Sequence, residues 1–280
     1  MRLASKGILI VVAAALLAVA LRWPDRTYRP PQETITVPAD PASIARGQHL
    51  VKAVAVCIVC HGDDLGGKLA FDDPLLGHGY TANLTAGRGG IGKRYTVQDW
   101  VRSIRYGVRP DRTAIQFMPS DHYNTISDAD LGAMIGYLTQ LPSIDNERTH
   151  VELNPVARVL MAVGLFGEVN RTARIDFAHP RSGFSPDEGA YLTQIAGCTF
   201  CHGSQLEGGQ GPEPGAPAAP NLMGTDPLRA ITKADFVRSL RQGIAMDGHM
   251  IEPKYMPWLG YRYMTDPELT SIWQHARRQD

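Results

Sequence analysis

The sequence has no excess charge of either sign, since 28 lysines and arginines balance 28 aspartates and glutamates over 280 residues. A neutral chain has no general attraction for nucleic acid or for an anionic surface, so any charged docking face would be a local patch. Convincing runs of alternating apolar and polar residues, typical of strands, are also missing, whereas glycine (28) and proline (20) are plentiful. The composition predicts an all-α protein with long irregular segments and no nucleic-acid partner.

Cysteine is scarce, and its placement is informative. All four cysteines stand in two Cys-x-x-Cys-His motifs, Cys57–His61 and Cys198–His202. Cysteines three residues apart close loops too small to restrict the unfolded chain much, which argues against structural disulfides. A thioredoxin-type redox motif would need a βαβ setting, which the sequence lacks. A zinc site shared by the cysteines gives no reason for a histidine after each pair.

The same spacing suits covalent attachment of haem c. Two thiols on one helical turn can form thioether bonds with one planar macrocycle, and the adjacent histidine can approach its iron. The sequence therefore predicts two covalently attached haem c groups. The attachment residues would be Cys57 with Cys60 and Cys198 with Cys201, and the first axial ligands would be His61 and His202.

The sequence around each motif is repeated as well. A helical segment precedes each motif, and the segments "QDWVRSIRYGV" (98–108) and "ADFVRSLRQGI" (234–244) follow in register. We therefore predict two modules, module 1 at residues 42–142 and module 2 at residues 185–280, each with three main helices.

The ends of the expected helices recur with the modules. Each start is a threonine or serine followed three residues later by an acidic residue, which resembles a capping box. A glycine after the middle helix of each module is a stop signal. The starts are Thr96, Ser127, Thr232 and Thr265, and the glycines are Gly107 and Gly243.

Three segments lie outside the modules. Residues 1–23 join a basic front to an apolar run, the pattern of an exported chain, and residues 24–41 are expected to be a linker. The apolar run is short for a membrane-spanning helix, which takes about 20 apolar residues. We expect a retained N-terminal anchor on the periplasmic side of the inner membrane, the alternative being a soluble periplasmic protein after cleavage at Ala20. Residues 143–184 form a connector whose apolar helix, 155–169, is expected to pack across both modules rather than contact the membrane.

The two motifs in matching modules resemble the dihaem members of the class I c-type cytochromes. In that family each module carries Cys-x-x-Cys-His near its front and a methionine ligand towards its end. Similar modules occur as cytochrome subunits of periplasmic dehydrogenases and as membrane-bound respiratory carriers. The resemblance covers both modules and implies two tandem cytochrome c-like domains, each wrapped around a covalently bound haem. Many dehydrogenase-associated cytochromes carry three such modules, whereas this chain has two.

The resemblance implies one methionine ligand in each module. Module 1 contains only Met118 and Met134, and Met134 falls on the apolar face of the last expected helix. Met118 and Met256 are each followed by proline, and each stands ten residues before the aspartate at the start of that helix, Asp128 or Asp266. We therefore expect Met118 and Met256 to be the second axial ligands.

Other side chains compete for roles at the same sites. Four histidines without a counterpart in the other module are rival ligands, expected instead to be surface or hydrogen-bonded core residues: His49, His78, His122 and His249. The strongest rival is His249, in a methionine-rich loop. Four recurring arginines could pair with haem propionates or face solvent: Arg102, Arg105, Arg238 and Arg241. The recurring Asn83 and Asn221 are candidates for capping loops around the haem.

Axial positions that are both filled leave no site for a substrate, so the sequence predicts one-electron transfer rather than catalysis. The donor would be a periplasmic or membrane dehydrogenase or a quinol-oxidising complex, and the acceptor a terminal oxidase or similar protein. The alternative is a catalytic dihaem enzyme, either peroxidase-like or thiosulfate dehydrogenase-like. The thiosulfate dehydrogenase family resembles this layout but uses a cysteine as axial ligand, and no cysteine is spare here.

Overall fold

The computed structural model describes residues 14, 17, 26–163, 170–179, 184–209, 211, 216–223 and 231–278. The leader expected over residues 1–23 lies outside this part, apart from Ala14 and Leu17. Within the described ranges, none of the helices combines the length and the apolar character that a membrane crossing requires.

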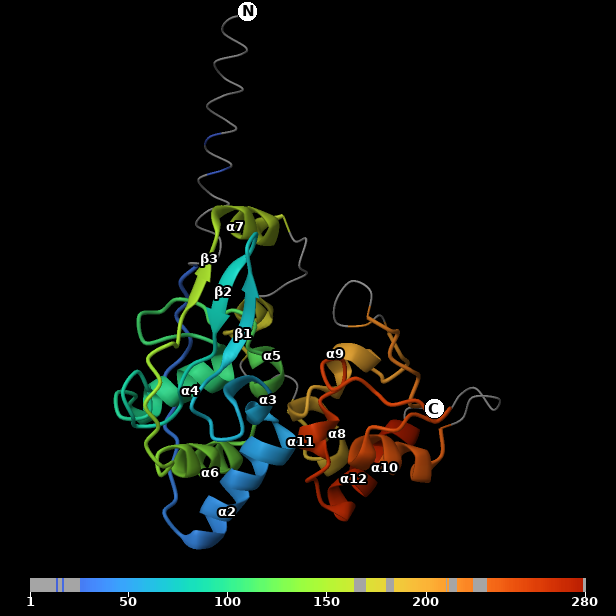
Figure 1. Ribbon diagram of the computed structural model, residues 1–280. Coiled ribbons are helices and arrows are strands. Elements are labelled where there is room, and N and C mark those ends of the chain that lie inside the picture. The colour runs from blue at the N-terminus through green and yellow to red at the C-terminus, as the bar shows by residue number, and fades with distance from the viewer. Residues whose placement is uncertain are drawn as a thin grey trace, which may run out of the picture.

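Helices occur in the same order in the two modules (Figure 1). Module 1 contains α2 (Pro41–His49), the π-helical turn η2 (Leu50–Val54), α3 (Cys57–His61), β1 (Leu69–Asp73), β2 (Gly77–Tyr80), α4 (Val97–Tyr106), α5 (Ser120–Tyr123) and α6 (Asp128–Leu138). The connector contains β3 (Val151–Leu153), α7 (Pro155–Ala162) and the 3-10 turn η3 (Arg171–Arg174). Module 2 contains α8 (Glu188–Ile195), α9 (Cys198–His202), α10 (Lys233–Gln242), α11 (Trp258–Tyr261) and α12 (Asp266–Arg277). Among the described residues, each module therefore has three longer helices, as expected, and two short ones.

The ends of the middle helices lie where the sequence predicts them. Thr96 and Thr232 each form a capping box with the aspartate three residues later. Gly107 and Gly243 end α4 and α10 with φ values of 64° and 68°, which glycine adopts without the steric penalty of a Cβ. A Cβ at Gly243 would also lie 2.2 Å from the ring of Trp258, so glycine lets α11 approach the end of α10.

A small sheet is present, which corrects the all-α prediction. The strands pair antiparallel in the order β1-β2-β3, with β1 and β2 from the glycine-rich stretch after the first motif and β3 from the connector. The strands are too short for a clear alternating pattern, and Gly77 and Gly79 interrupt β2. Glycine is needed at position 79 because a Cβ there would lie 2.3 Å from the Phe71 ring.

The segments that flank module 1 pack against it. In the expected linker, Ile35 is buried and Glu33 accepts hydrogen bonds from Arg105 and Tyr106. At the start of the connector, the carbonyl of Ile144 accepts a hydrogen bond of 2.7 Å from the amide of Asn83. These contacts hold the linker before module 1 and the start of the connector after it against the surface of module 1.

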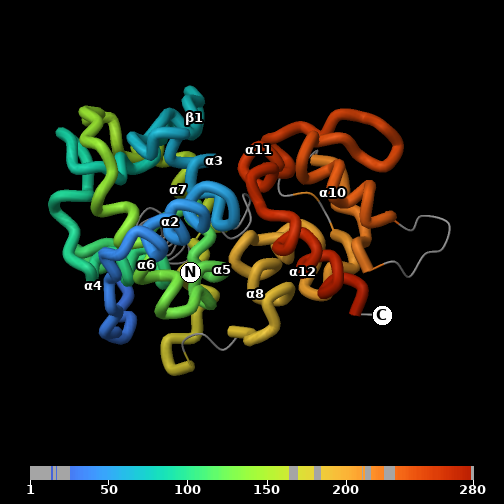
Figure 2. Tube along the Cα trace, turned by 90° about the horizontal axis from the view of Figure 1, so that it is seen from below, coloured from blue at the N-terminus to red at the C-terminus, as the bar shows by residue number. Residues whose placement is uncertain are grey.

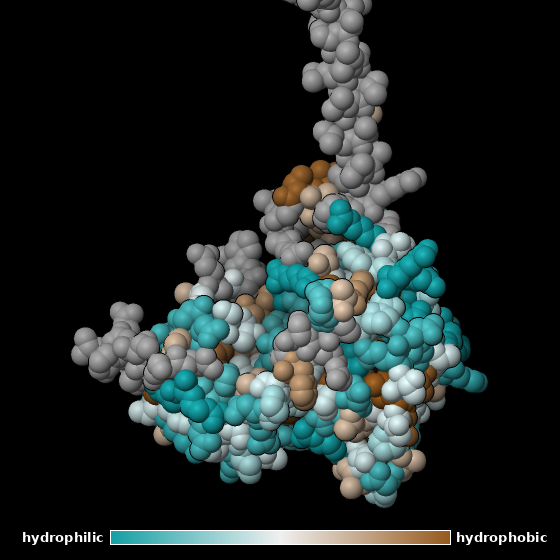
Figure 3. All heavy atoms as spheres, turned by 180° about the vertical axis from the view of Figure 1, so that it is seen from behind, coloured by the Kyte–Doolittle hydropathy of each residue, from teal (hydrophilic) through white to brown (hydrophobic). Residues whose placement is uncertain are grey.

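In the described part of the connector, Arg171 contacts both modules. The guanidinium of Arg171 forms an ion pair of 2.8 Å with Asp121 in module 1 and lies 4.4 Å from the ring centre of Phe200 in module 2. Helix α7 ends at Ala162, and residues 164–169 of the expected helix lie outside the described residues. The face of the molecule in Figure 3 is largely hydrophilic, with an apolar patch at the end that carries α7 and smaller apolar areas elsewhere.

The two modules pack through corresponding elements (Figure 2). Helix α5 contacts α8, and α11 contacts η2, so the short helix after each Met-Pro pair lies against the helical segment before the other module's motif. A Cβ at Gly260 in α11 would lie 2.4 Å from the side chain of Val56, so glycine permits this approach. One set of buried apolar side chains, from Leu50 in module 1 to Ile272 in module 2, runs through both modules.

Glu268, in the first turn of α12, is the polar centre of this interface. Its carboxylate accepts hydrogen bonds from His49 at 2.8 Å, from Arg46 at 3.3 Å and from the N–H of Thr265 at 2.8 Å. Burial alone would raise the pKa of Glu268, but the hydrogen bonds from His49 and Thr265 outweigh it and lower the pKa to about 2. Folding and module packing therefore favour the charged carboxylate.

Glu268→Gln is expected to lower the free energy of unfolding at neutral pH and to make that free energy less dependent on pH in the acid range. Because the pKa is depressed in the folded state, the stabilisation is complete above the ordinary value of 4.5 and is lost as pH falls towards about 2. The variant should lose about 2 kcal/mol at neutral pH, the range for hydrogen bonds to charged groups, and should show a flatter decline below pH 4.5. Thermal unfolding at a series of pH values measures both effects.

Asp145→Asn is the matched control, because it breaks an ion pair of 2.9 Å with Arg88 in which both side chains are more than half exposed. Such surface pairs contribute little, so its melting temperature should remain close to that of the wild type. A Glu268→Gln protein with the same acid profile as the wild type would contradict the assigned role of Glu268.

Candidate functional site

The two Cys-x-x-Cys-His motifs form the short helices α3 and α9, each entered through a left-handed residue. Val56 has φ 43° and ψ 40°, and Gly197 has φ 74° and ψ 19°. Glycine adopts this conformation freely, whereas it is uncommon for a β-branched valine. The same sharp turn therefore presents both motifs, although the residue that makes it differs.

The histidine of each motif is oriented by a backbone carbonyl. Nδ1 of His61 lies 2.8 Å from the oxygen of Ala82, and Nδ1 of His202 lies 2.9 Å from the oxygen of Pro220. A carbonyl can only accept, so Nδ1 carries the hydrogen and Nε2 keeps its lone pair. Burial lowers the pKa of both imidazoles. The neutral ring with a free Nε2 is the form that binds a metal.

The four cysteines do not have the properties expected of a redox motif, of structural disulfides or of a shared zinc site. Burial is the main cause that raises the pKa of the Cys57 and Cys198 thiols to about 12, whereas a nucleophilic redox cysteine needs a lowered pKa. All four thiols are free of disulfide bonds. Within the described residues, the single cluster of three or more potential metal ligands contains no cysteine, so a shared zinc site is not formed. Haem attachment at these thiols stays a prediction.

In module 2, the residues expected to hold a haem line one cavity of about 580 Å³. Cys198, Cys201, His202 and Met256 all line it. Most of the other lining side chains are apolar, among them Leu206, Leu222, Ile231, Phe236, Leu240 and Ile272. The volume is typical of cofactor pockets, which are mostly apolar with a few polar groups. The donor set and the apolar wall fit a large flat group held by two thiols and an imidazole.

In module 1, the corresponding residues lie against the apolar core. Cys57, Ile58 and Met118 are partly buried and pack on it, together with Ala82, whose carbonyl holds His61. Cys57 and the expected methionine of this module thus both pack on the apolar core that runs through the two modules. The arrangement corresponds to that of module 2, where Cys198 and Met256 pack on the same core.

The two expected methionine ligands stand in loops of the same geometry. Pro119 has φ −79° and ψ 55°, and Pro257 has φ −80° and ψ 49°. The residue after each proline donates its N–H to the carbonyl of the methionine at 2.8 Å, in both Met118 and Met256. These are inverse γ-turns, so the repeated Met-Pro pair is a repeated backbone turn.

Two buried tyrosines join these loops to the motifs, and our sequence analysis missed them. Tyr123 donates its hydroxyl hydrogen to the carbonyl of Ala55 at 2.7 Å, and Tyr261 donates to Ala196 at 2.5 Å. Each acceptor stands two residues before the first cysteine of its motif. The signal was available as the shared pattern Met-Pro-x-x-x-Tyr, at residues 118–123 and 256–261.

Each recurring arginine forms an ion pair with an aspartate of the chain: Arg102 with Asp99, Arg238 with Asp235, Arg105 with Asp128, and Arg241 with Asp266. Arg105 is completely buried, which excludes the solvent-facing alternative for this residue. Because Asp128 and Asp266 begin the last helix of each module, Arg105 and Arg241 fasten the middle helix to that helix.

The rival histidines are held by side chains of the protein. Nε2 of His78 lies 3.4 Å from Glu152, Nε2 of His122 accepts from Arg171 at 2.9 Å, and His49 bonds to Glu268. His249 lines the cavity of module 2, but its Nδ1 lies 2.5 Å from Asp247. The partners of His49, His78 and His122 agree with the expectation of surface or hydrogen-bonded core histidines, whereas His249, whose Nδ1 alone is engaged, stays the strongest rival ligand.

The two recurring asparagines cap the loops that follow the carbonyls of Ala82 and Pro220. The side-chain oxygen of Asn83 accepts from the N–H of Thr85 at 2.9 Å, and that of Asn221 accepts from the N–H of Met223 at 2.7 Å. The expected capping role is therefore present in both modules. Each turn fixes the loop whose preceding carbonyl orients the motif histidine.

The two sites are neighbours across the module interface. Phe200, inside the second motif, has its ring centre 6.1 Å from that of His122 in α5, the helix that follows Met118. Arg171 lies against the same ring and donates to His122. The second motif therefore contacts the segment that carries the expected methionine ligand of the first.

Comparisons with known proteins agree with the cytochrome c class. Residues 42–138 match the family described as cytochrome c oxidase, cbb3-type, subunit III. The chain is 29% identical over 204 residues to the fructose dehydrogenase cytochrome subunit of Gluconobacter japonicus, which covers 68% of this chain and 40% of that protein. It is 34% identical over 105 residues to the cytochrome c subunit of the quinone alcohol dehydrogenase of Gluconobacter oxydans. This match covers 35% of this chain and 21% of that protein.

A third relative is a nicotinate dehydrogenase subunit of Pseudomonas putida, 29% identical over 202 residues, which covers 68% of this chain and 16% of that protein. The chain thus spans less than half the length of each of these curated relatives. Together the matches support the cytochrome c class, which implies covalently bound haem c and electron transfer.

Removing the hydroxyl of Tyr261 is expected to destabilise the protein. Tyr261→Phe keeps the ring but leaves the carbonyl of Ala196 without its partner, at a cost of about 1–3 kcal/mol. Tyr123→Phe should have the same effect at Ala55. Chemical denaturation measures the loss, and Tyr263→Phe is the control because Tyr263 is 55% exposed. A Tyr261→Phe protein as stable as the control would show that this bond does not hold the loop.

Proposed function

We propose that this chain is the electron-transfer subunit of an oxidoreductase complex and carries two covalently attached haem c groups. They would occupy two tandem cytochrome c-like domains, at residues 42–142 and 185–280. The observation that carries the proposal is the cavity of module 2, in which both cysteines, the histidine and the register-matched methionine meet within an apolar wall. The recurrence of the same local geometry in module 1 supports a second group there.

In each module, different residues would attach the haem and bind its iron. Two cysteines attach it, at Cys57 and Cys60 in module 1. His61 would bind the iron through Nε2, because its Nδ1 is engaged by Ala82, and Met118 would supply sulfur as the second ligand. A haem c with histidine and methionine ligands exchanges one electron at a time and has no free coordination position for substrate.

The chain contributes orientation and exclusion of water. The carbonyls of Ala82 and Pro220 orient the imidazoles. The tyrosines tie the methionine loops to the motifs, which keeps the two ligand-bearing segments together. The apolar wall would limit access of water to the haem, and solvent access and local dielectric help to set the reduction potential.

The names of the relatives favour a dehydrogenase as the electron donor. Two of them are named as cytochrome subunits of sugar or alcohol dehydrogenases. By analogy, this chain would accept electrons from a periplasmic dehydrogenase and pass them to a respiratory acceptor such as a terminal oxidase. The leader at residues 1–23 would export it to the periplasmic side of the inner membrane, where it is retained as an anchor or removed.

Replacing an axial methionine is expected to change one haem and leave the other intact. Met118→Ala and Met256→Ala should each remove about half of the absorption band between methionine sulfur and ferric iron, and each should lower the potential of one haem, because thioether sulfur stabilises ferrous iron. Redox titration followed by absorption measures both. Met134→Leu is the control, since Met134 is buried in α6 but is not an expected ligand.

Retention of the full band in either alanine variant would contradict the ligand assignment for that module. Absence of the band from one oxidised haem of the wild type, or spectroscopic loss of its methionine ligand on reduction, would instead favour the peroxidase-like alternative, with a displaceable ligand. The two results are distinguishable because the first concerns the variant alone and the second the wild type.

The partner can be identified by gentle solubilisation of native membranes and mass spectrometry of the proteins that accompany the haem-stained band. A dehydrogenase is expected, and addition of its substrate should reduce both haems. A haem-stained band that migrates alone as a soluble protein would contradict the subunit assignment, and a quinol-oxidising complex in its place would replace the proposed donor.

A further inference from the structure

Four side chains with metal-binding atoms lie on one face of the small sheet, outside the motifs of the proposed haem sites. Asp72 is opposite His78 across β1 and β2, and His78 is opposite Glu152 across β2 and β3. His150 stands two residues before Glu152, so the period of a strand puts both on the same face. The backbone register thus gathers two imidazoles and two carboxylates on neighbouring strands.

The distances suit a metal ion. Nε2 of His78 lies 3.4 Å from one oxygen of Glu152, and Nε2 of His150 lies 2.7 Å from the other. The ligand atoms of the three residues all lie within 4.8 Å of one another. Bonds of about 2.0–2.1 Å to zinc in tetrahedral geometry separate ligand atoms by about 3.3 Å, so small side-chain movements would seat an ion.

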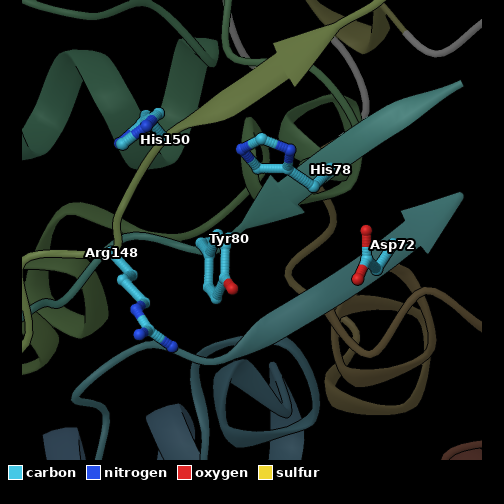
Figure 4. A pocket seen from close by; sticks show the side chains of 5 residues that line it. All are labelled: Asp72, His78, Tyr80, Arg148 and His150. Atoms are coloured by element: carbon cyan, nitrogen blue, oxygen red, sulfur yellow. The ribbon is translucent and has the colours of Figure 1, made fainter. Parts of the chain in front are cut away.

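The surroundings are open and on balance negative. A hollow of about 300 Å³ is lined by Asp72, His78, Tyr80, Arg148 and His150 (Figure 4). In this view the guanidinium of Arg148 lies beside Tyr80, whereas Asp72 lies on the neighbouring strand beside His78. The carboxylates of Asp72 and Glu152 outnumber that single cation. The side chains of His78, His150 and Glu152 are 40%, 60% and 59% exposed, so an ion can enter.

We propose that His78, His150 and Glu152 form a binding site for a divalent transition-metal ion of the zinc type. Two imidazoles and one carboxylate are ligands that zinc accepts, whereas magnesium and calcium prefer oxygen ligands alone. Three protein ligands leave the fourth tetrahedral position to water. Because His78 belongs to β2 while Glu152 belongs to β3, the bound ion cross-links module 1 to the connector.

The site is also placed to act on the loop of Met118. Phe71, on the strand paired with β2, points away from the metal-binding face, since it covers Gly79, the neighbour of His78. Its ring centre lies 6.0 Å from that of Phe117, the residue before Met118. An ion that fixes the sheet therefore fixes the packing partner of this loop.

Titration of the haem-loaded protein with zinc chloride tests the site, with protein prepared without a polyhistidine tag. Isothermal titration calorimetry should show one ion per chain, and magnesium chloride should give no binding. Hydrogen–deuterium exchange should slow over residues 77–80 and 151–153 when zinc is added. His78→Ala, His150→Ala and Glu152→Gln should each weaken binding at least about tenfold, since even the loss of an outer partner of a ligand costs 10–100-fold.

His179→Ala is the matched control, because His179 is an exposed histidine that pairs with one carboxylate, Asp176 at 2.9 Å, outside this cluster. Its affinity for zinc should equal that of the wild type. Absence of binding, or binding that survives all three ligand variants, would overturn the proposal and leave the cluster as an ion-pair network. The proposal would equally fail if exchange slowed elsewhere but not in β2 and β3.

Discussion

One hydrogen bond in each module determines how the site is built. The Nδ1 hydrogen of His61 or His202 is donated to a backbone carbonyl, so the ring can present only Nε2 to a metal. The carbonyl comes from a loop about twenty residues further along the chain, which must therefore lie over the motif helix. The asparagine after the carbonyl caps that loop, and the buried tyrosine ties the methionine loop to the other end of the motif. The orientation of one imidazole thus constrains three separate segments.

The two modules pack against each other and are not separated by an extended linker. The short helices after the Met-Pro pairs pack against the segments before the motifs of the opposite module, and a single apolar core passes through both. Phe200 of the second motif contacts the α5 helix that follows Met118, with Arg171 of the connector beside it. Under the proposed function, contacts of this kind would hold the two proposed haem sites next to each other.

Sequence reasoning succeeded where structure depends on a few consecutive residues. Capping boxes at Thr96 and Thr232 and the stop signals at Gly107 and Gly243 are local, so they could be predicted from spacing alone. The methionine loops were placed by register between the modules, and their turns match in backbone geometry.

Contacts between distant segments could not be predicted in the same way. The sheet was missed because β3 lies about seventy residues from its partner β2 and the strands carry glycines in place of alternating side chains. The left-handed Val56 was hidden because its counterpart is a glycine while valine rarely adopts that conformation. Glu268 looked like an ordinary capping residue, and its bonds to Arg46 and His49 exist only because the modules pack together.

The number of haem groups per chain is the quantity on which the proposed function depends most directly. Intact-mass spectrometry of the denatured protein measures it, because thioether bonds survive unfolding whereas axial ligands do not. The wild type should have the mass of the mature chain plus two haem groups, while a Cys57→Ala/Cys60→Ala variant and a Cys198→Ala/Cys201→Ala variant should each carry one. A wild-type mass that corresponds to one haem or none would contradict the two-site assignment.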